Sequence, residues 1–522
     1  MPVRIKNLAA HHHHPWFPIT FVSMSIMKKL AGETIYYGIS SIFGRFINFF
    51  LTPIYTYSVI IDKAKMGHLT ELMAYTAIIL ILFTCRMEAA YFRFGKDKDN
   101  QEAAYRNSVT TVVSLSVFFG LLLFMLSPII APVLDYGGEH IYFQLLAVIM
   151  TIDAFCELPL SRLRFEGKAK KFAFIRIINI LTNVCFNIFF VVVCPRLYDA
   201  GYSFVTAWFD PEKIIVYIFL SQVFGSLSSL ILLSKYLKGV GRVDIPLLKR
   251  MVAYSWPLII VSLVSMFNEM FGRVILKWFL TGSLSDNEAQ LGVYGANYRL
   301  ATIIALFTQA FRYAAEPFFF KESNNVGAEK TYADVTKYYL IFSIYGFLFV
   351  SLYIDIFKYF VGPKYFEGLK VVPILLLANV FNGLYFNVSI WYRLKDKTLT
   401  GAMIAIFGAV LTLFFNWYLI PILGYIGSAI ATLVCYSSMT IICFVLGQKV
   451  MKVPYQVRTM LLWMGAAILI QIGIWYLRSL DISVYLVLLC STIGIVLFSG
   501  LIWSYEKEKI KTLLRSIKLR SR

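Results

Sequence analysis

Charged residues are scarce in this chain, and their scarcity excludes an ordinary soluble fold. Only 15% of the 522 residues are Asp, Glu, Lys or Arg, and 59% are apolar, whereas a soluble domain carries about 25% charged residues. No polar stretch is long enough to form a separate soluble domain. Apolar runs of about twenty residues, long enough to cross a hydrocarbon layer of ~30 Å, recur from end to end. The composition therefore predicts an all-α polytopic membrane protein.

Familiar catalytic and metal-binding motifs are also missing. The sequence contains no GxxxxGK[ST], and therefore no nucleotide-binding loop of that kind, and no HExxH or GxSxG. The 7 cysteines show no CxxC spacing, and their odd number argues against a disulfide framework or a zinc site. We expect buried, unpaired thiols. We also expect that the protein is not an enzyme, with no catalytic residues, no cofactor and no metal.

The apolar runs predict about fourteen transmembrane helices. We place them near residues 34–58, 67–92, 107–131, 140–160, 172–193, 214–234, 251–280, 290–320, 332–356, 371–392, 398–420, 425–447, 456–477 and 482–504. Most Lys and Arg outside these spans lie in one alternate set of loops, which includes both termini. This asymmetry predicts that both termini are cytoplasmic. The same asymmetry explains the net charge of +20 by membrane topology and attraction to anionic lipid headgroups, so the charge does not indicate a nucleic-acid-binding surface.

The chain resembles itself at an offset of about 225–229 residues. Phe43-Gly44-Arg45 recurs as Phe271-Gly272-Arg273, and Phe186-Asn187 recurs as Phe415-Asn416. The offset covers six spans, so both halves keep the same orientation, as in transporters with parallel repeats. We expect two six-helix lobes related by a pseudo-twofold axis along the membrane normal, around a central cavity.

These observations divide the chain into five parts. Residues 1–27, which include His11 to His14, resemble an N-terminal extension or tag more than a signal peptide. The remaining parts are the N-lobe (28–238), the C-lobe (239–450), two further helices (451–505) and a basic cytoplasmic tail (506–522).

Several cations fall inside the predicted spans, where each costs about 2.5–3.5 kcal/mol at a helix centre unless it has a partner or water. They are Arg45, Arg86, Arg176, Arg273, Lys277, Arg299 and Arg312. All except Arg176 lie on the equivalent first two spans of the two lobes, so we expect them to line a cationic cavity. Guanidinium groups there would suit a phosphate-bearing cargo. The alternative is local pairing: Arg86 with Glu88, Arg273 with Glu269, and Arg312 with Glu316.

Acidic residues inside spans are candidates for ion coupling. Asp153 and Glu157 lie four residues apart on one helix face, and Glu269 shares a face with Arg273 and Lys277. A carboxylate in a low-dielectric site has a raised proton affinity, which would suit coupling to H⁺ or Na⁺. For Asp153 and Glu157, the alternative is structural pairing with Arg162, Arg164 or Arg176.

The sequence resembles the polysaccharide flippases of the multidrug/oligosaccharidyl-lipid/polysaccharide (MOP) exporter superfamily. The resemblance rests on Tyr37-Gly38 to Pro53, Gly292-Val293-Tyr294, Glu316-Pro317-Phe318, and Asn416 with Pro421 to Thr432, within residues 28–505. It implies transport of an undecaprenyl-diphosphate-linked repeat unit of O-antigen of lipopolysaccharide, capsule or exopolysaccharide across a bacterial inner membrane. It also implies a cationic cavity that includes Arg45, Arg273, Arg299 and Arg312, and a pathway shared with a polymerase and glycosyltransferases.

Other functions remain open from the sequence. A lipid II flippase or a cation-coupled multidrug exporter belongs to the same superfamily, although an exporter of organic cations would need acids rather than cations in its cavity. A membrane-embedded glycosyltransferase or polymerase would need catalytic acids and usually a large outer loop. The longest such loop, 194–213, offers only Asp199, Asp210 and Glu212.

Overall fold

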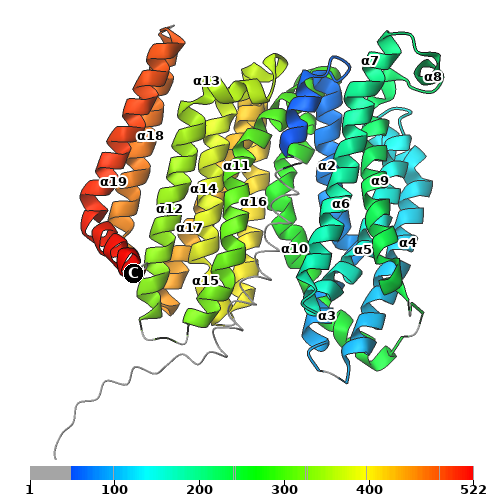
Figure 1. The fold of residues 1–522 in the computed structure, drawn as a ribbon, viewed down its shortest axis with the longest axis horizontal. Helices are drawn as coiled ribbons and strands as arrows, with labels where there is room; N and C mark the ends of the chain where they lie inside the picture. Colours follow the sequence, from blue (N-terminus) through cyan, green and yellow to red (C-terminus); the bar gives the residue numbers. More distant parts are fainter. Residues whose placement is uncertain are drawn as a thin grey trace, which may run out of the picture.

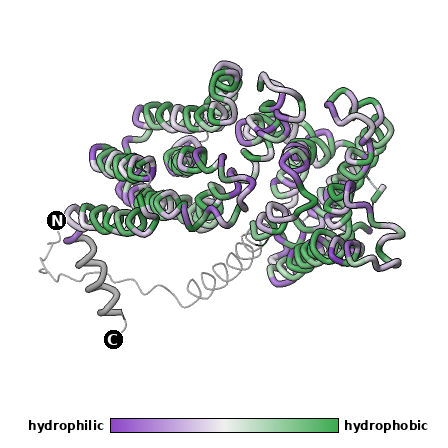
Figure 2. The backbone as a smooth tube through the Cα atoms, turned by 90° about the horizontal axis from the view of Figure 1, so that it is seen from above, coloured by the Kyte–Doolittle hydropathy of each residue, from purple (hydrophilic) through white to green (hydrophobic). Residues whose placement is uncertain are grey.

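The computed structural model describes residues 47–520, apart from positions 48, 98, 239, 242, 324, 326, 396 and 481. This part of the chain is helical and contains no β-strand, which confirms the expected all-α class. Viewed from the side, the helices stand nearly parallel, and viewed from above they form two clusters (Figures 1 and 2). We call the end of the molecule near α7, α8 and α13 the upper end, and the end near α3 and α15 the lower end (Figure 1).

The first bundle contains the helical residues 49–57 and the elements up to η3. Its elements are α2 (Lys63–Thr84), α3 (Met87–Phe94), α4 (Gln101–Val133), α5 (Ile141–Phe165), α6 (Ala169–Ile188), the π-helix η1 (Phe189–Val193), α7 (Cys194–Asp199), α8 (Ser203–Thr206), η2 (Pro211–Lys213), α9 (Ile214–Leu233) and η3 (Ser234–Leu237). The extensive packing of α4 on α5, and of α9 on both α5 and α6, holds this bundle together.

The second bundle extends from α10 to α17, and α18 and α19 follow it. The elements are α10 (Ile245–Phe279), α11 (Leu284–Glu322), α12 (Ala328–Leu352), α13 (Ile354–Phe357), η4 (Lys358–Phe360), η5 (Pro363–Val371), α14 (Val372–Val388), α15 (Ile390–Leu394), α16 (Thr398–Leu423), α17 (Tyr425–Val450), α18 (Val457–Ser479) and α19 (Val484–Arg520). The last two helices stand at the outer edge of the bundle, beside α12 (Figure 1).

The expected transmembrane spans correspond closely to these helices. Among the described residues, 12 helical segments are long and apolar enough to cross a membrane. The expected span 290–320 is the 39-residue helix α11, which is long enough but richer in polar residues. The expected span 34–58 lies mostly outside the described residues, although residues 49–57 are helical. A polytopic membrane protein is therefore confirmed.

The expected continuous span 67–92 is wrong in one respect, because the structure divides it into α2 and α3. Cys85 and Arg86 separate the two helices and have φ values of 45° and 53°. Positive φ is uncommon for residues other than glycine. Hydrophobic periodicity did not reveal the break, because apolar residues lie on both sides of it.

Helix α10 belongs to both bundles. Near its lower end, Asn107 of α4 accepts a hydrogen bond from the backbone N–H of Asp244, which caps α10. Nearer its upper end, Asn268 donates to the carbonyl of Ala405 in α16, and Ser428 of α17 donates to the carbonyl of Gly272. The helix therefore crosses from one bundle to the other between its two ends.

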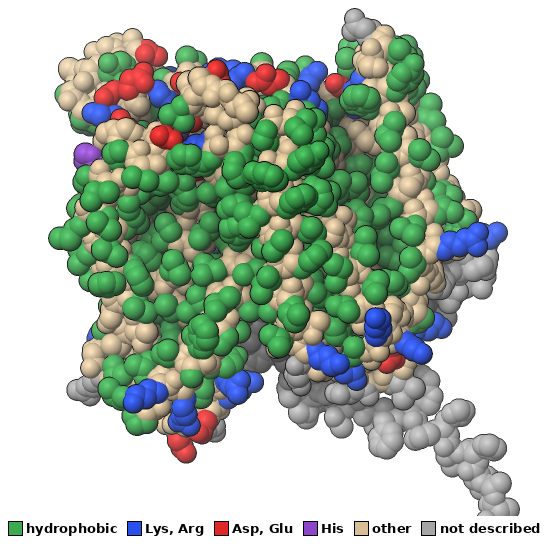
Figure 3. Space-filling model, turned by 180° about the vertical axis from the view of Figure 1, so that it is seen from behind, with side chains coloured by type: hydrophobic (Ala, Val, Ile, Leu, Met, Phe, Trp, Pro, Cys, Tyr) green, Lys and Arg blue, Asp and Glu red, His purple; other side chains and the backbone are tan. Residues whose placement is uncertain are grey.

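The surface of the molecule fits a membrane environment. A broad apolar band covers its middle, while Lys and Arg gather at the lower edge and charges of both signs occur at the upper edge (Figure 3). Two of the links predicted to be cytoplasmic, those next to α3 and α15, lie at the lower end (Figure 1).

Candidate functional site: the seam between the bundles

Helices α2 and α11 form the main contact between the bundles. Their backbones come so close that a Cβ at Gly67 would overlap the carbonyl of Glu288, and one at Gly292 would overlap the carbonyl of Lys63. A Cβ at Gly295 would likewise overlap the side chain of Thr70. Small residues allow such close packing of transmembrane helices. We call this contact the seam.

A buried ion pair reinforces the seam. Lys277 Nζ in α10 lies 2.9 Å from Glu71 Oε2 in α2, and both side chains are 0% exposed. Tyr136 donates to the same carboxylate oxygen (2.9 Å), Tyr75 donates to Oε1 (2.5 Å), and Lys277 also donates to the carbonyl of Leu134 (2.7 Å). Every charged atom of this pair has a partner. Lys277, which was predicted to line the cavity, is therefore already paired within the seam.

The ion pairs that join the bundles lie near the upper end. His68 Nε2 in α2 is 2.8 Å from Glu288 Oε1 in α11, and Lys63 Nζ is 2.6 Å from Glu367 Oε1 in η5. With Lys277 and Glu71, these are the pairs found between the bundles in the part of the chain that the structure describes. Contacts between basic and acidic side chains therefore join the bundles near the upper end.

Arg299 of α11 lies in the seam. Its guanidinium donates to the Thr52 hydroxyl (3.4 Å) and to the Met73 sulfur (3.7 Å), and it lies 5.6 Å from the centre of the Tyr55 ring. All three partners belong to the first bundle. Within the described ranges, no carboxylate forms an ion pair with Arg299. A guanidinium held by a hydroxyl, a thioether and a ring keeps its capacity to bind an anion.

Arg273 of α10 lies against Tyr298 of α11, the residue that precedes Arg299. It stacks 4.2 Å from the centre of the Tyr298 ring, and it donates to the backbone carbonyl of Glu269 at 3.2 Å. Its Nε is buried without a hydrogen-bond partner. The local Arg273–Glu269 ion pair that the sequence left open does not form here, and the Glu269 side chain is exposed.

The remaining predicted cations lie elsewhere. Arg86 forms the local pair with Glu88, Nη1 to Oε1 2.9 Å. Arg312 lies 4.6 Å from the centre of the Phe386 ring, and Arg393 lies 4.7 Å from the same ring, in the lower half of the second bundle. Arg45 and the side chain of Glu316 lie outside the described residues.

The acids of α5 lie inside the first bundle rather than at the seam. Glu157 is 3.5 Å from Arg164 and 3.8 Å from Arg176, so the structural pairing left open by the sequence is present. Asp153 instead accepts a hydrogen bond from the Ser226 hydroxyl in α9 at 2.5 Å.

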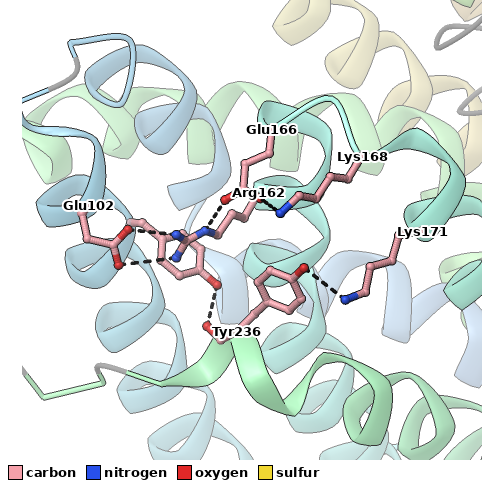
Figure 4. A network of polar contacts seen from close by, with 7 residues as sticks. Glu102, Arg162, Glu166, Lys168, Lys171 and Tyr236 are labelled. Atoms are coloured by element: carbon pink, nitrogen blue, oxygen red, sulfur yellow. Dashed lines mark hydrogen bonds and ion pairs between the residues drawn. The ribbon is translucent and has the colours of Figure 1, made fainter.

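A second polar network fixes the lower end of the first bundle (Figure 4). Arg162 bridges Glu102 of α4 (2.9 Å) and Glu166 (2.7 Å), and Lys168 also reaches Glu166 at 2.7 Å. Partial burial raises the pKa of Glu166, but hydrogen bonds from Arg162 and Lys168 outweigh it, and the net pKa is lowered. This network holds α4 and α5 together and is separate from the seam.

Sequence reasoning missed the acids that close the seam. Glu71 lies inside the predicted span 67–92, yet we did not count it among the intramembrane acids, and Glu288 falls just before the predicted span 290–320. The available signal was that a carboxylate within a membrane span needs a cationic partner. Lys277, which was predicted to line the cavity, is on a different span and was one of the cations with no local acid suggested as its partner.

Two helical bundles stand side by side, and the long helix α10 contacts both of them. Solved structures of membrane transporters, among them a member of the MOP superfamily, share this fold. The lipid II flippase MurJ in an inward closed conformation superposes with a TM-score of 0.69 at 14% identity, over 91% of this chain and 100% of that one. An inward-facing multidrug resistance transporter of the MATE family gives 0.57 at 15% identity, over 80% and 94%.

The family model for polysaccharide biosynthesis proteins matches residues 60–361, more than half of the chain, so the protein belongs to that family. No curated protein matches the sequence. At such low identities, the solved structures establish the fold alone.

Proposed function

We propose that this protein is a flippase for a lipid-linked oligosaccharide. Its cargo is a repeat unit of O-antigen, capsule or exopolysaccharide on undecaprenyl diphosphate, moved from the cytoplasmic to the outer leaflet of a bacterial inner membrane. Membership of the polysaccharide biosynthesis family and the MOP fold support this proposal. A polymerase and glycosyltransferases of the same pathway would be its functional partners.

The observation that carries the proposal is the pair Arg273 and Arg299. Both guanidiniums lie beside the seam, and neither has an ion-pair partner among the described residues. Intramembrane cations are costly, so they mark substrate pathways when they lack a structural partner. A diphosphate offers the planar, bidentate acceptors that guanidinium prefers.

The observed ion pairs support a smaller set of cations for the proposed cargo site. We leave out Lys277 and Arg86, because Glu71 and Glu88 already pair with them. Arg312 and Arg393, which both lie close to the Phe386 ring, would contact the cargo nearer the lower end. We keep Arg45 in the proposed site because it is the counterpart of Arg273 in the internal repeat.

The closed upper end fits one stage of alternating access. Ion pairs and backbone contact join the bundles there, and the described residues show no such pairs between the bundles at the lower end. If the lower end is cytoplasmic, as its Lys and Arg favour, this conformation would receive cargo from the cytoplasmic leaflet. Opening of the seam would then release it outward.

Reconstituted vesicles provide the decisive test. The full chain is inserted with a fluorescent disaccharide on a polyprenyl diphosphate, and flipping is followed by chemical quenching of the outer leaflet. Arg273→Ala and Arg299→Ala should each abolish flipping above protein-free vesicles. Arg86→Ala, which removes a locally paired arginine, serves as the matched control. Wild-type rates in both seam variants would reject the proposed site.

Orientation has its own test. Single cysteines in loops 93–106 and 161–171 should resist an impermeant thiol reagent applied to intact cells. They should react after the cells are opened. Labelling in intact cells would reverse the proposed topology.

A lipid II flippase is the second candidate, because the fold matches that of MurJ over nearly the whole chain. Lipid II shares the polyprenyl diphosphate, so competition between lipid II and an oligosaccharide diphosphate in the same vesicles separates the two. A glycosyltransferase is disfavoured, because two acids of the longest upper loop have structural partners: Glu212 pairs with Lys65 (2.7 Å), and Asp210 with Lys213 (3.3 Å). An exporter of organic cations is disfavoured by Arg273 and Arg299.

A further inference from the structure

A cleft of about 150 Å³ opens in the lower half of the second bundle, between α17 and α18. Its accessible surface is apolar, and its walls come from four helices and the link between α17 and α18. Each helix contributes lining residues, among them Leu340 of α12, Leu384 of α14, Phe444 of α17 and Met464 of α18. Ile441 and Leu461, which are 58% and 59% exposed, flank its open side.

Polar contacts between α12 and the last two helices explain why the cleft exists. Lys337 of α12 pairs with Glu506 of α19 at 2.8 Å, and both are almost fully buried. Arg478 of α18 pairs with Asp355 at 2.8 Å and donates to the carbonyl of Leu352 at 2.5 Å. The two pairs fix α18 and α19 to α12 near both ends, and α18 packs mainly on α12 and α19. This packing leaves a gap between α18 and α17, which is the cleft.

The mouth of the cleft is basic at the lower end. Lys449 lies in the last turn of α17, Lys452 lies in the link, and Arg458 follows the lining residue Val457, which begins α18. All three are exposed, and no ion pair involves them among the described residues. Tyr455 of the link lines the cleft between these cations.

We propose that this cleft binds a resident anionic phospholipid, with one acyl chain between α17 and α18 and its headgroup on Lys452 and Arg458. Because the accessible surface of the cleft is apolar and the cleft opens beside exposed apolar residues, the hydrocarbon of a membrane can fill it. Basic residues at the level of the headgroups attract anionic lipids at about 1 kcal/mol per charge. The apolar cleft would therefore bind the acyl chain and the basic residues the headgroup of one anionic phospholipid.

This lipid site is distinct from the seam. Its lining residues belong to α12, α14, α17, α18 and the link, whereas Arg273 and Arg299 lie on α10 and α11. The bound lipid would complete the packing between the second bundle and α18. The proposal does not depend on the identity of the cargo.

Native mass spectrometry of the full chain, released from detergent after incubation with defined lipids, tests the headgroup. The wild type should retain phosphatidylglycerol at least about tenfold better than phosphatidylcholine. The double variant Lys452→Gln/Arg458→Gln should lose most of this preference. The control Lys170→Gln/Lys238→Gln removes the same charge from exposed lysines of the first bundle, and it should keep the preference. Equal retention of both lipids by the wild type would overturn the proposal, as would equal loss in both double variants.

A second variant tests the acyl-chain site. Ile441→Trp would fill the open side of the cleft and should reduce retained phosphatidylglycerol about as much as the charge variant. Ile472→Trp places the same ring on an exposed position of α18 (54%) that does not line the cleft, so it should leave retention unchanged. Displacement of phosphatidylglycerol by an equimolar polyprenyl diphosphate would assign the cleft to the cargo tail and reject a resident phospholipid. Because the assay measures binding without transport, its result is independent of the flippase proposal.

Discussion

Lys277 and Glu71 form a fully buried ion pair that joins α10 to α2, with Nζ 2.9 Å from Oε2. Tyr75 and Tyr136 complete the hydrogen bonding of the carboxylate. A buried pair of this kind contributes little net stability compared with an apolar replacement, but removing one partner leaves an uncompensated charge. The pair therefore specifies one arrangement of the two helices more than it stabilises the fold.

Neutralising one partner should destabilise the protein more than neutralising both. Glu71→Gln and Lys277→Met each leave a buried charge unpaired, at a cost of about 3–5 kcal/mol. The double variant carries no charge at the site, so its thermal unfolding in detergent should occur nearer the wild-type temperature than that of either single variant. A double variant whose loss equals the sum of the two single losses would show that the residues are not coupled.

The contrast between Lys277 and Arg273 shows what the sequence could and could not predict. Both were predicted to line one cavity, because they lie on the first span of the second lobe, where they share a helix face. The positions of the helices followed from apolar runs, which are local. Pairing of Lys277 with Glu71 depends on the contact between α10 and α2. The two residues are about two hundred positions apart in the chain, so no local sequence pattern could predict that they meet. Arg86 and Glu88 pair within one turn, so the sequence could offer that pair as an alternative.

Enlarging a seam glycine should open the upper end. A Cβ at Gly292 would overlap the carbonyl of Lys63, so Gly292→Ala should shift the protein toward conformations in which α2 and α11 are apart. In a background without the native cysteines, a short thiol crosslinker between Lys63→Cys and Glu367→Cys reports closure. Crosslinking should fall several-fold in Gly292→Ala. Gly465→Ala is the control, because a Cβ there meets nothing within 4 Å. Unchanged crosslinking in Gly292→Ala would mean that the seam adapts without opening.

The geometry of Arg273 should matter in addition to its charge. Arg273→Lys keeps a cation but loses the planar group that stacks on Tyr298 and could bind two phosphate oxygens. We expect flipping by Arg273→Lys to fall about tenfold, corresponding to about 1.4 kcal/mol of transition-state stabilisation, while Arg273→Ala is inactive. Initial rates in vesicles would distinguish the variants. Full activity of Arg273→Lys would show that a point charge is sufficient.

Acid should weaken the lower network of the first bundle through Glu166. Partial burial opposes ionisation of Glu166, but Arg162 and Lys168 lower its pKa below the ordinary 4.5. A lowered pKa in the folded state stabilises the protein above the ordinary pKa, and this contribution is lost as the pH falls toward the lowered value. Glu166→Gln should therefore reduce the unfolding temperature more at pH 7 than at pH 3. An equal loss at both pH values would exclude an ionic origin.

Asp153 is the better candidate for ion coupling of the two acids in α5. Glu157 already lies near Arg164 and Arg176, whereas Asp153 has the neutral hydroxyl of Ser226 as its hydrogen-bond donor. A carboxylate with a neutral partner can exchange a proton or bind Na⁺ without breaking an ion pair. Asp153→Asn keeps the size and an acceptor for Ser226, so the fold should persist. In vesicles, it should abolish the stimulation of flipping by an imposed H⁺ or Na⁺ gradient while leaving gradient-free flipping intact. Glu157→Gln is the control and should keep the stimulation. If Asp153→Asn responds to both gradients as the wild type does, Asp153 is a structural residue of the first bundle.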